Sequence, residues 1–319
     1  MIPYVKDCIP AGFGLPLDVW VLDNASVIGC ASNFLYSHPM KVAFQGRHGA
    51  YSESVAFHLL GKDVETIPAD TFEDLHRMVQ SGKVNYGIIP IENSTTGSVL
   101  ENYDLLLKYR LPIISELKLQ IDHCLIALKG EKIETLTQVI SHPQALEQCS
   151  NFFESQPQIE KKPFFDTAGS VEKIAGKQLR GVGGIASAFA AEYYGLDVLK
   201  NPLANFPGTN STRFFAIQKE PVSIDASLHT KTSIAFIVKK NLPGALHACL
   251  GCFAKHGVDL IRIESRPKSG CLWEYIFYAD LAGNPLQEYV ELALQELKAM
   301  ADVILLGSYV RGENRGVEF

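Results

Sequence analysis

Four short clusters of small polar residues stand out in this chain, at residues 46–52, 92–98, 141–144 and 166–170. Each cluster follows an apolar, strand-like run and precedes a helical pattern. At such a junction the free backbone N–H groups and the positive end of the helix dipole favour an anion. Any one cluster alone is better explained as a set of helix caps. The four together predict a cleft that binds a carboxylate.

The elements that would position these clusters form an α/β pattern between residue 41 and about residue 200. Short apolar runs alternate there with amphipathic stretches, which predicts mostly parallel sheets. In open α/β sheets the ligand binds at the carboxyl ends of the strands, where the clusters fall. Strands are expected at 41–45, 65–67, 86–91, 113–128, 139–140, 164–165 and 183–185. Helices are expected at 51–60, 72–80, 100–109, 143–153, 170–177 and 186–194.

A polar segment at 220–231 precedes a second and more compact pattern. Its order, βαββαβ, is that of a ferredoxin-like domain. The apolar residues Leu246, Cys249, Leu250 and Phe253 give the first of its helices one apolar face. Strands are expected at 233–239, 259–265, 272–281 and 303–310, and helices at 244–256 and 285–300.

Composition excludes several classes of partner and site. The net charge of −6 argues against nucleic acid and acidic membranes as partners. The sequence contains no run of 18 or more apolar residues, so no membrane span is expected. The seven scattered cysteines are typical of thiols in a reducing compartment, so we expect a cytoplasmic protein. Residues 1–39 lack the features of a secretory or transit signal. We expect them to be a loosely attached extension, or Met40 to be the natural start.

Four residues near position 250 have the side-chain types of zinc ligands, but their positions on the expected helix argue against a metal site. Cys249, Cys252 and His256 lie along one side of the expected helix, but His247 points away from them. Structural zinc needs four convergent ligands, so no metal is expected. A thioredoxin-like role for the two cysteines is also disfavoured, because they lie within the helix and not at its amino end.

Seven fragments, in order along the chain, resemble the prephenate dehydratase family and its ACT regulatory domain. Each fragment is weak alone, whereas seven in the family's usual order are specific. The first five are GRHGAYS (46–52), PIENSTTGS (90–98), SHPQA (141–145), DTA (166–168) and NSTRF (210–214), the last being the family's signature. The other two are PGAL (243–246) and ESRP (264–267), similar to the two motifs of ACT domains.

The resemblance implies an α/β fold with two lobes of the periplasmic-binding-protein type, the substrate between them, and a ferredoxin-like βαββαβ ACT domain. The chain would cross between the lobes near 115–120 and return near 200. The implied divisions are an extension (1–39), a dehydratase domain (41–219), a linker (220–231), an ACT domain (232–310) and a C-terminal tail (311–319).

The chemistry implied by the resemblance is the loss of carbon dioxide and water from prephenate, which gives phenylpyruvate for phenylalanine synthesis. Aromatisation drives this reaction, so no cofactor is expected. The site must hold a dianion and help hydroxide to leave. It must also keep a strong ion pair away from the departing carboxylate, since such a pair would stabilise the ground state more than the transition state.

The residue roles implied by the resemblance centre on Thr212, expected to hydrogen-bond the departing hydroxyl. Arg213 is expected to anchor the surviving carboxylate, because a guanidinium binds carboxylates bidentately. His142 and Glu92 are candidate acids or bases, although His142 is equally well explained as a cap and Glu92 as an ion-pair partner. The residues expected to contact the substrate through neutral groups are Asn93, Ser94, Ser141, Thr167 and Ser211.

The resemblance also implies that L-phenylalanine binds between ACT domains of neighbouring subunits and inhibits a homodimer or homotetramer. The bland alternative is an ordinary turn and a surface Glu–Arg pair. The expected effector residues are Gly244, Ala245, Leu246, Glu264, Ser265, Arg266 and Pro267.

Two rival functions stay open. An arogenate dehydratase performs the same chemistry on the amino analogue, and the sequence does not separate the two substrates. A non-enzymatic carboxylate sensor would use the same fold but would not need Thr212 beside Arg213.

Overall fold

The computed structural model describes residues 39–222, 230–268 and 274–312, together with the backbone of 314–315. The expectations for the N-terminal extension therefore fall outside the described residues as far as position 38.

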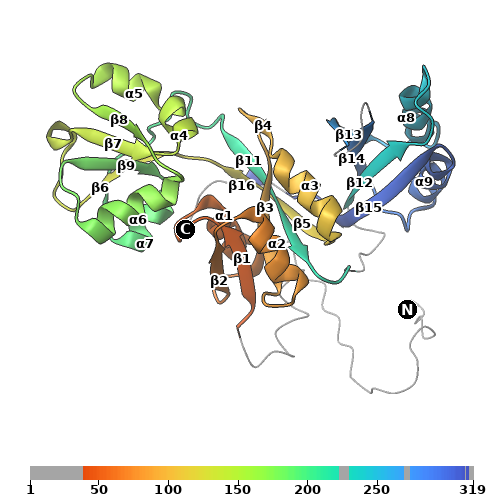
Figure 1. Ribbon diagram of the computed structural model, residues 1–319, viewed down its shortest axis with the longest axis horizontal. Coiled ribbons are helices and arrows are strands. Elements are labelled where there is room, and N and C mark those ends of the chain that lie inside the picture. Colours follow the sequence, from red (N-terminus) through yellow and green to blue (C-terminus); the bar gives the residue numbers. More distant parts are fainter. Residues whose placement is uncertain (1–38, 223–229, 269–273, 313, 316–319) are drawn as a thin grey trace, which may run out of the picture. The chain divides into compact units, whose positions relative to one another are not determined.

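The first sheet is mixed, with strand order β16-β5-β11-β3-β1-β2 and β4 paired to β3 (Figure 1). β1 runs parallel to β2 and β3, whereas β11 runs antiparallel to β3 and β5. The prediction of mostly parallel sheets is therefore wrong for the part of the sheet formed by β3, β11 and β5. The reason is that β11 re-enters this sheet from the second lobe. The strands are β1 (Lys41–Gln45), β2 (Glu65–Ala69), β3 (Tyr86–Asn93), β4 (Gly97–Ser98), β5 (Ile113–Gln120), β11 (Ser211–Gln218) and β16 (Asn314–Arg315). The helices are α1 (Tyr51–Leu60), α2 (Phe72–Gln80) and α3 (Leu100–Tyr109).

The second sheet has the order β10-β6-β9-β7-β8. The single helix expected at 143–153 is two helices, because the chain leaves helical geometry at the buried Cys149. The strand expected at 164–165 lies earlier, at β8. The strands are β6 (Cys124–Ala127), β7 (Gln138–Ser141), β8 (Glu160–Pro163), β9 (Val182–Ala186) and β10 (Asp197–Lys200). The helices are the 3-10 turn η1 (Ile133–Thr135), α4 (Pro143–Gln148), α5 (Ser150–Ser155), α6 (Thr167–Lys177) and α7 (Ala188–Tyr194).

Two segments join these sheets. The first crossing is at 121–123, after β5 ends, so the crossing predicted near 115–120 comes a few residues too early. The chain returns through 201–210, between β10 and β11. Contacts such as the hydrogen bond from Ser187 Oγ to the Gly49 carbonyl (3.0 Å) also tie the lobes together.

The third sheet has the order β13-β14-β12-β15, and every neighbouring pair is antiparallel. Its elements follow the predicted βαββαβ order. Its core with the two helices includes Phe236, Phe253 and Leu297. On the other face Tyr278 and Tyr309 join the core of the first sheet. The elements are β12 (Thr230–Val238), α8 (Ala245–Lys255), β13 (Leu260–Pro267), β14 (Tyr275–Ala282), α9 (Glu288–Met300) and β15 (Ala301–Val310).

The first and third sheets come into close contact at Gly307 of β15. A Cβ atom at this position would lie 2.2 Å from the carbonyl oxygen of Ile113 on β5, so only glycine fits. The glycine allows the two sheets to meet backbone against backbone.

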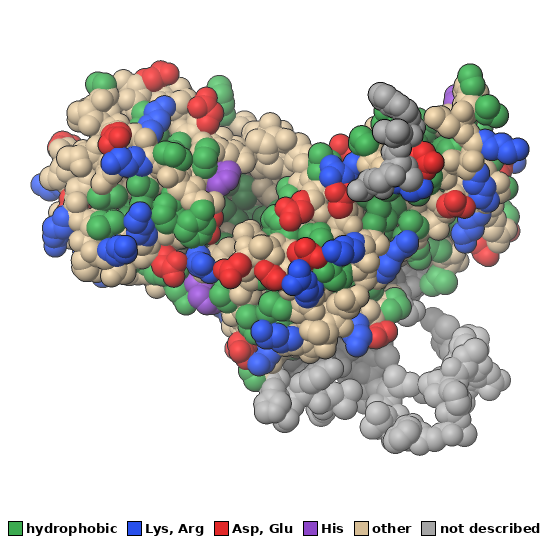
Figure 2. All heavy atoms as spheres, viewed as in Figure 1, with side chains coloured by type: hydrophobic (Ala, Val, Ile, Leu, Met, Phe, Trp, Pro, Cys, Tyr) green, Lys and Arg blue, Asp and Glu red, His purple; other side chains and the backbone are tan. Residues whose placement is uncertain are grey.

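The surface carries charges of both signs. On the face shown in Figure 2, Lys and Arg side chains are interspersed with Asp and Glu, without an extended basic patch. Within the described ranges, no helix is both long enough and apolar enough to span a bilayer.

Candidate active site

The candidate site is built on the antiparallel pair β3 and β11, where Thr212 lies opposite Asn93. Both side chains are almost fully buried, with 8% of each exposed. The Asn93 amide donates from Nδ2 to Thr212 Oγ1 (2.9 Å) and to Asn210 Oδ1 (2.7 Å). The signature hydroxyl is therefore held by neutral amides.

The other end of the Asn93 side chain organises the turn that follows β3. Its Oδ1 accepts hydrogen bonds from the backbone N–H and the hydroxyl of Thr95 (3.0 and 2.6 Å). It also accepts from the N–H and hydroxyl of Thr96 (3.1 and 3.2 Å). With its amide used at both ends, Asn93 has one defined orientation.

Gln148, at the end of α4, links this group to the second lobe. Its Oε1 accepts from Asn210 Nδ2 (3.1 Å), and its Nε2 donates to Thr95 Oγ1 (2.9 Å). Gln144 donates to the hydroxyl of Thr96 from the same helix (3.2 Å). Gln148 was not predicted from the sequence as a site residue, although its spacing of four from Gln144 places both on one helix face.

His123 extends the network into the crossing segment. Its Nε2 lies 2.9 Å from Gln148 Oε1, and its Nδ1 lies 3.1 Å from the Tyr51 hydroxyl. An amide oxygen only accepts, so Nε2 carries the proton. Burial outweighs the hydrogen bond to Gln148 and lowers the pKa of His123, which favours the neutral ring.

A pH dependence of stability follows from this depressed pKa. Unfolding returns the ring to a pKa of about 6.5, so the unfolded chain binds more protons as the solution is acidified. The contribution of His123 to the free energy of unfolding is fully present above the unfolded-state pKa. It is lost as the pH falls through the folded-state pKa. Between pH 7 and 5, denaturant titrations should show a shallower fall in unfolding free energy for His123→Gln than for the parent. The buried His76, whose pKa burial also lowers, acts in the same direction in both proteins. Equal slopes would contradict this account.

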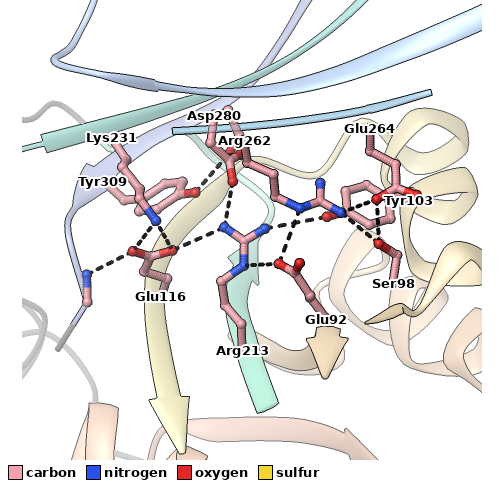
Figure 3. Close-up of polar contacts among 12 residues, drawn as sticks. Glu92, Ser98, Tyr103, Glu116, Arg213, Lys231, Arg262, Glu264, Asp280 and Tyr309 are labelled. Atoms are coloured by element: carbon pink, nitrogen blue, oxygen red, sulfur yellow. Dashed lines mark hydrogen bonds and ion pairs between the residues drawn. The ribbon is translucent and has the colours of Figure 1, made fainter. Parts of the chain in front are cut away.

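Arg213 does not face the same space as Thr212. The prediction that its guanidinium anchors the substrate is therefore corrected. Adjacent strand residues point to opposite faces. The guanidinium lies among three carboxylates, at 2.5 Å from Asp280, 3.4 Å from Glu92 and 3.6 Å from Glu116 (Figure 3). Burial would lower the pKa of Arg213, but Asp280, Tyr309 and Tyr103 together outweigh burial and raise the pKa.

The two candidate acid–base residues have other partners. Glu92 Oε2 lies 3.4 Å from Arg213 Nε and 3.2 Å from Arg262 Nε, on the face away from Thr212. The ring of His142 caps α4 by accepting from the backbone N–H of Gln144 (3.3 Å). These positions correspond to the ion-pair and capping explanations.

The serines expected to contact substrate are mostly engaged with backbone. Ser141 is fully buried and donates to the Ile185 carbonyl (2.7 Å), so the structure places it inside the second lobe and not at an open surface. Ser94 donates to the Thr209 carbonyl (2.9 Å), and Ser211 donates to the Leu119 carbonyl (3.2 Å). Thr167 is half-buried at the start of α6.

The expected effector residues fall into two separate groups. Gly244, Ala245 and Leu246 line a pocket of about 350 Å³ together with Tyr275 and Phe277. On β13, by contrast, Glu264 accepts from Ser98 Oγ (2.6 Å) and Arg266 pairs with Asp104. Ser265 and Pro267 alternate with these residues and are exposed. Within one chain, the second motif therefore does not contribute to the pocket.

The residues considered for zinc have other contacts. Cys249 and Cys252 are buried, and burial raises the pKa of each thiol. His256 Nε2 lies 2.8 Å from Glu296. In the described part of the chain, no group of three or more His, Cys, Asp or Glu side chains could hold a metal ion.

Comparison with known proteins agrees with this architecture. The family model described as prephenate dehydratase matches residues 42–222. Arogenate dehydratase 2 of Petunia hybrida is 38% identical over 285 residues, which cover 85% of this chain and 71% of that protein.

Two solved structures extend the likeness beyond the family model. One is described as GqqA, a quorum quenching acylase; it has a TM-score of 0.78 at 30% identity, covering 85% of this chain and 97% of that one. The other is prephenate dehydratase from Arthrobacter aurescens in complex with L-Phe. It has a TM-score of 0.77 at 28% identity, covering 85% of this chain and 90% of that one.

Proposed function

Since this chain belongs to the prephenate dehydratase family and is a hydro-lyase, we propose that it converts prephenate to phenylpyruvate, carbon dioxide and water. The observation that carries the proposal is the neutral network around Thr212. Asn93, Asn210, Gln148 and Thr95 supply amides and hydroxyls, and among the residues that the structure describes no charged side chain bonds to the Thr212 hydroxyl.

This arrangement suits the chemistry of decarboxylation with loss of water. The carbon–carboxylate bond breaks, its electron pair aromatises the ring, and the carbon–oxygen bond to the hydroxyl breaks at the other end. The leaving hydroxide takes up a proton to become water. The Thr212 hydroxyl would hydrogen-bond this leaving oxygen, and neutral surroundings would leave the departing carboxylate free to lose its charge.

Arogenate is the second candidate substrate, because Arogenate dehydratase 2 of Petunia hybrida is among the relatives. Incubation of the protein with prephenate and, separately, with arogenate should resolve the choice. Chromatography would measure phenylpyruvate from the first substrate and phenylalanine from the second, and a higher kcat/KM on prephenate is expected. An acylase assay is a third test to include, since a protein described as a quorum quenching acylase is also similar. A protein that turns over neither prephenate nor arogenate would overturn the proposal.

Gln148 should contribute to this activity through the network. Replacing it with alanine removes the partner of both Asn210 and Thr95, which hold Asn93. A small displacement of catalytic groups lowers turnover steeply, so kcat should fall by about tenfold. The matched control is Gln158→Ala, an exposed glutamine whose side chain bonds to Gln156. Equal kcat values for the two variants would contradict the role.

Regulation by L-phenylalanine is the second part of the proposal. The pocket beside Gly244 and Ala245 has a volume of about 350 Å³ and lies within the range of small-molecule sites, about 300–1,000 Å³. The similar enzyme from Arthrobacter aurescens was solved with L-Phe. We propose a homodimer or homotetramer in which the exposed Ser265 and Pro267 meet the pocket of a neighbouring subunit. Calorimetry with L-phenylalanine tests the binding of the effector, and light scattering tests the oligomeric state. Absence of binding would refute the proposed regulation.

We also propose a cytoplasmic location. Cys124, Cys149, Cys249 and Cys252 are free and buried thiols, as a reducing compartment favours. Recovery of the native protein in a cytosolic fraction is the expected result.

A further inference from the structure

The strand pair that carries Asn93 and Thr212 has a second face, and on it lie Glu92 and Arg213. These two residues are opposite one another in the β3–β11 register. Because strand residues alternate in direction, the residues next to the catalytic pair point to the third sheet. A backbone shift at Glu92 or Arg213 would therefore also move Asn93 and Thr212, their neighbours on the same two strands.

The third sheet holds both of these side chains. Asp280 of β14 pairs with Arg213 at 2.5 Å, and Arg262 of β13 pairs with Glu92 at 3.2 Å. The side chains of Arg213 and Asp280 are each only 6% exposed, so water screens this pair little. Ser233 of β12 donates to the other oxygen of Asp280 at 2.6 Å and fixes its orientation.

We infer that Glu92 and Arg213 are positioning residues through which Asp280 and Arg262 of the third sheet hold Asn93 and Thr212 in place. The link also connects to the pocket, because Phe277 lines the pocket and lies on β14, the strand that carries Asp280. A ligand that displaced β14 would change the position of the Asp280 carboxylate. The inference deepens the proposed function, and its activity readouts depend on that function.

A second ion pair between the same domains provides a matched control. Arg266 of β13 pairs with Asp104 of α3 at a more exposed position. Asp104 bonds neither to Glu92 nor to Arg213 through any contact in the described residues. Its loss tests domain docking in general, whereas loss of Asp280 or Arg262 tests the specific link.

The experiment compares Asp280→Asn, Arg262→Gln and Asp104→Asn in the full chain. The first two should lower kcat by about tenfold, with KM changed by no more than about twofold, and should weaken inhibition by L-phenylalanine. Asp104→Asn should keep the parental kcat. Asp280→Glu, which retains the charge, should recover part of the lost kcat.

Hydrogen exchange measured by mass spectrometry supplies a readout that does not need turnover. Exchange at the amides of 93–94 and 211–213 should be faster in Asp280→Asn than in the parent and unchanged in Asp104→Asn. If Asp280→Asn does not fold, Ser233→Ala should show the same changes to a smaller degree, because it removes the hydrogen bonds to the Asp280 carboxylate and the Tyr309 hydroxyl but keeps the carboxylate.

The outcomes separate this inference from the proposed function. A parent that turns over neither prephenate nor arogenate defeats the proposed function, and exchange alone then decides the link. Folded Asp280→Asn and Arg262→Gln proteins with parental kcat and parental exchange overturn the inference. Equal losses in Asp104→Asn also overturn it, because they would show a general effect of docking.

Discussion

Replacement of Thr212 by alanine should lower kcat about 10²- to 10³-fold, the effect of removing one preorganised donor, with little change in KM. The hydroxyl is held by Asn93 Nδ2 at 2.9 Å, and Asn93 is itself fixed by Asn210 and two threonines. Its orientation is therefore set before the substrate binds. The effect should appear in kcat because the bond to the leaving oxygen strengthens as the carbon–oxygen bond breaks.

Steady-state kinetics of phenylpyruvate formation would measure this loss. Thr212→Ser keeps a hydroxyl and should retain much more activity than Thr212→Ala. Thr209→Ala is the matched control, since that hydroxyl donates to the Phe206 carbonyl three residues earlier in the chain. Near-parental turnover in Thr212→Ala would remove Thr212 from the mechanism.

Gly307→Val should lower the free energy of unfolding by about 3 kcal/mol or more, because the new side chain overpacks the contact between β15 and β5. A Cβ atom there would meet the backbone N, C and O atoms of Ile113 at 2.2–2.9 Å. Ile113 begins β5 and its backbone is paired with Ile217 of β11, so these atoms cannot rotate away as a side chain would. The strain falls on the contact between the first and third sheets.

Urea titration of both proteins would measure the change. Gly251→Ala is the control: this glycine lies inside α8, and an added Cβ would have no atom within 4 Å. That substitution should raise stability by about 0.5–1 kcal/mol, since glycine is unfavourable within a helix. A Gly307→Val protein as stable as the parent would show that the sheets can move apart.

The sequence predicted the architecture well where local pattern determines it. The alternation of apolar runs and helices predicted the α/β architecture, and the order of elements after residue 230 predicted the ferredoxin-like sheet. The division into two lobes was implied by the resemblance. The direction of β11 was not predicted, because it depends on where a strand from a later part of the chain enters the first sheet.

The candidate site was predicted less completely, and Arg213 shows why. Its type and its place beside Thr212 suggested a substrate anchor. The strand period of two turns it to the other face, and its closest partner, Asp280, is 67 residues away in the sequence. Gln148 was missed for a related reason: its partners are distant in the sequence, with Thr95 in the first lobe and Asn210 in the returning segment.

The bulge in the β3–β11 pairing, between Arg213 and Phe214, has a consequence for insertions and deletions. A slip of β11 by a single residue in one direction would put the Arg213 cation in the place of Thr212 and the Phe214 ring among the three carboxylates. Both the chemistry and the contact with the third sheet would then fail at once. This short strand should therefore accept many changes of side chain more readily than any change of length.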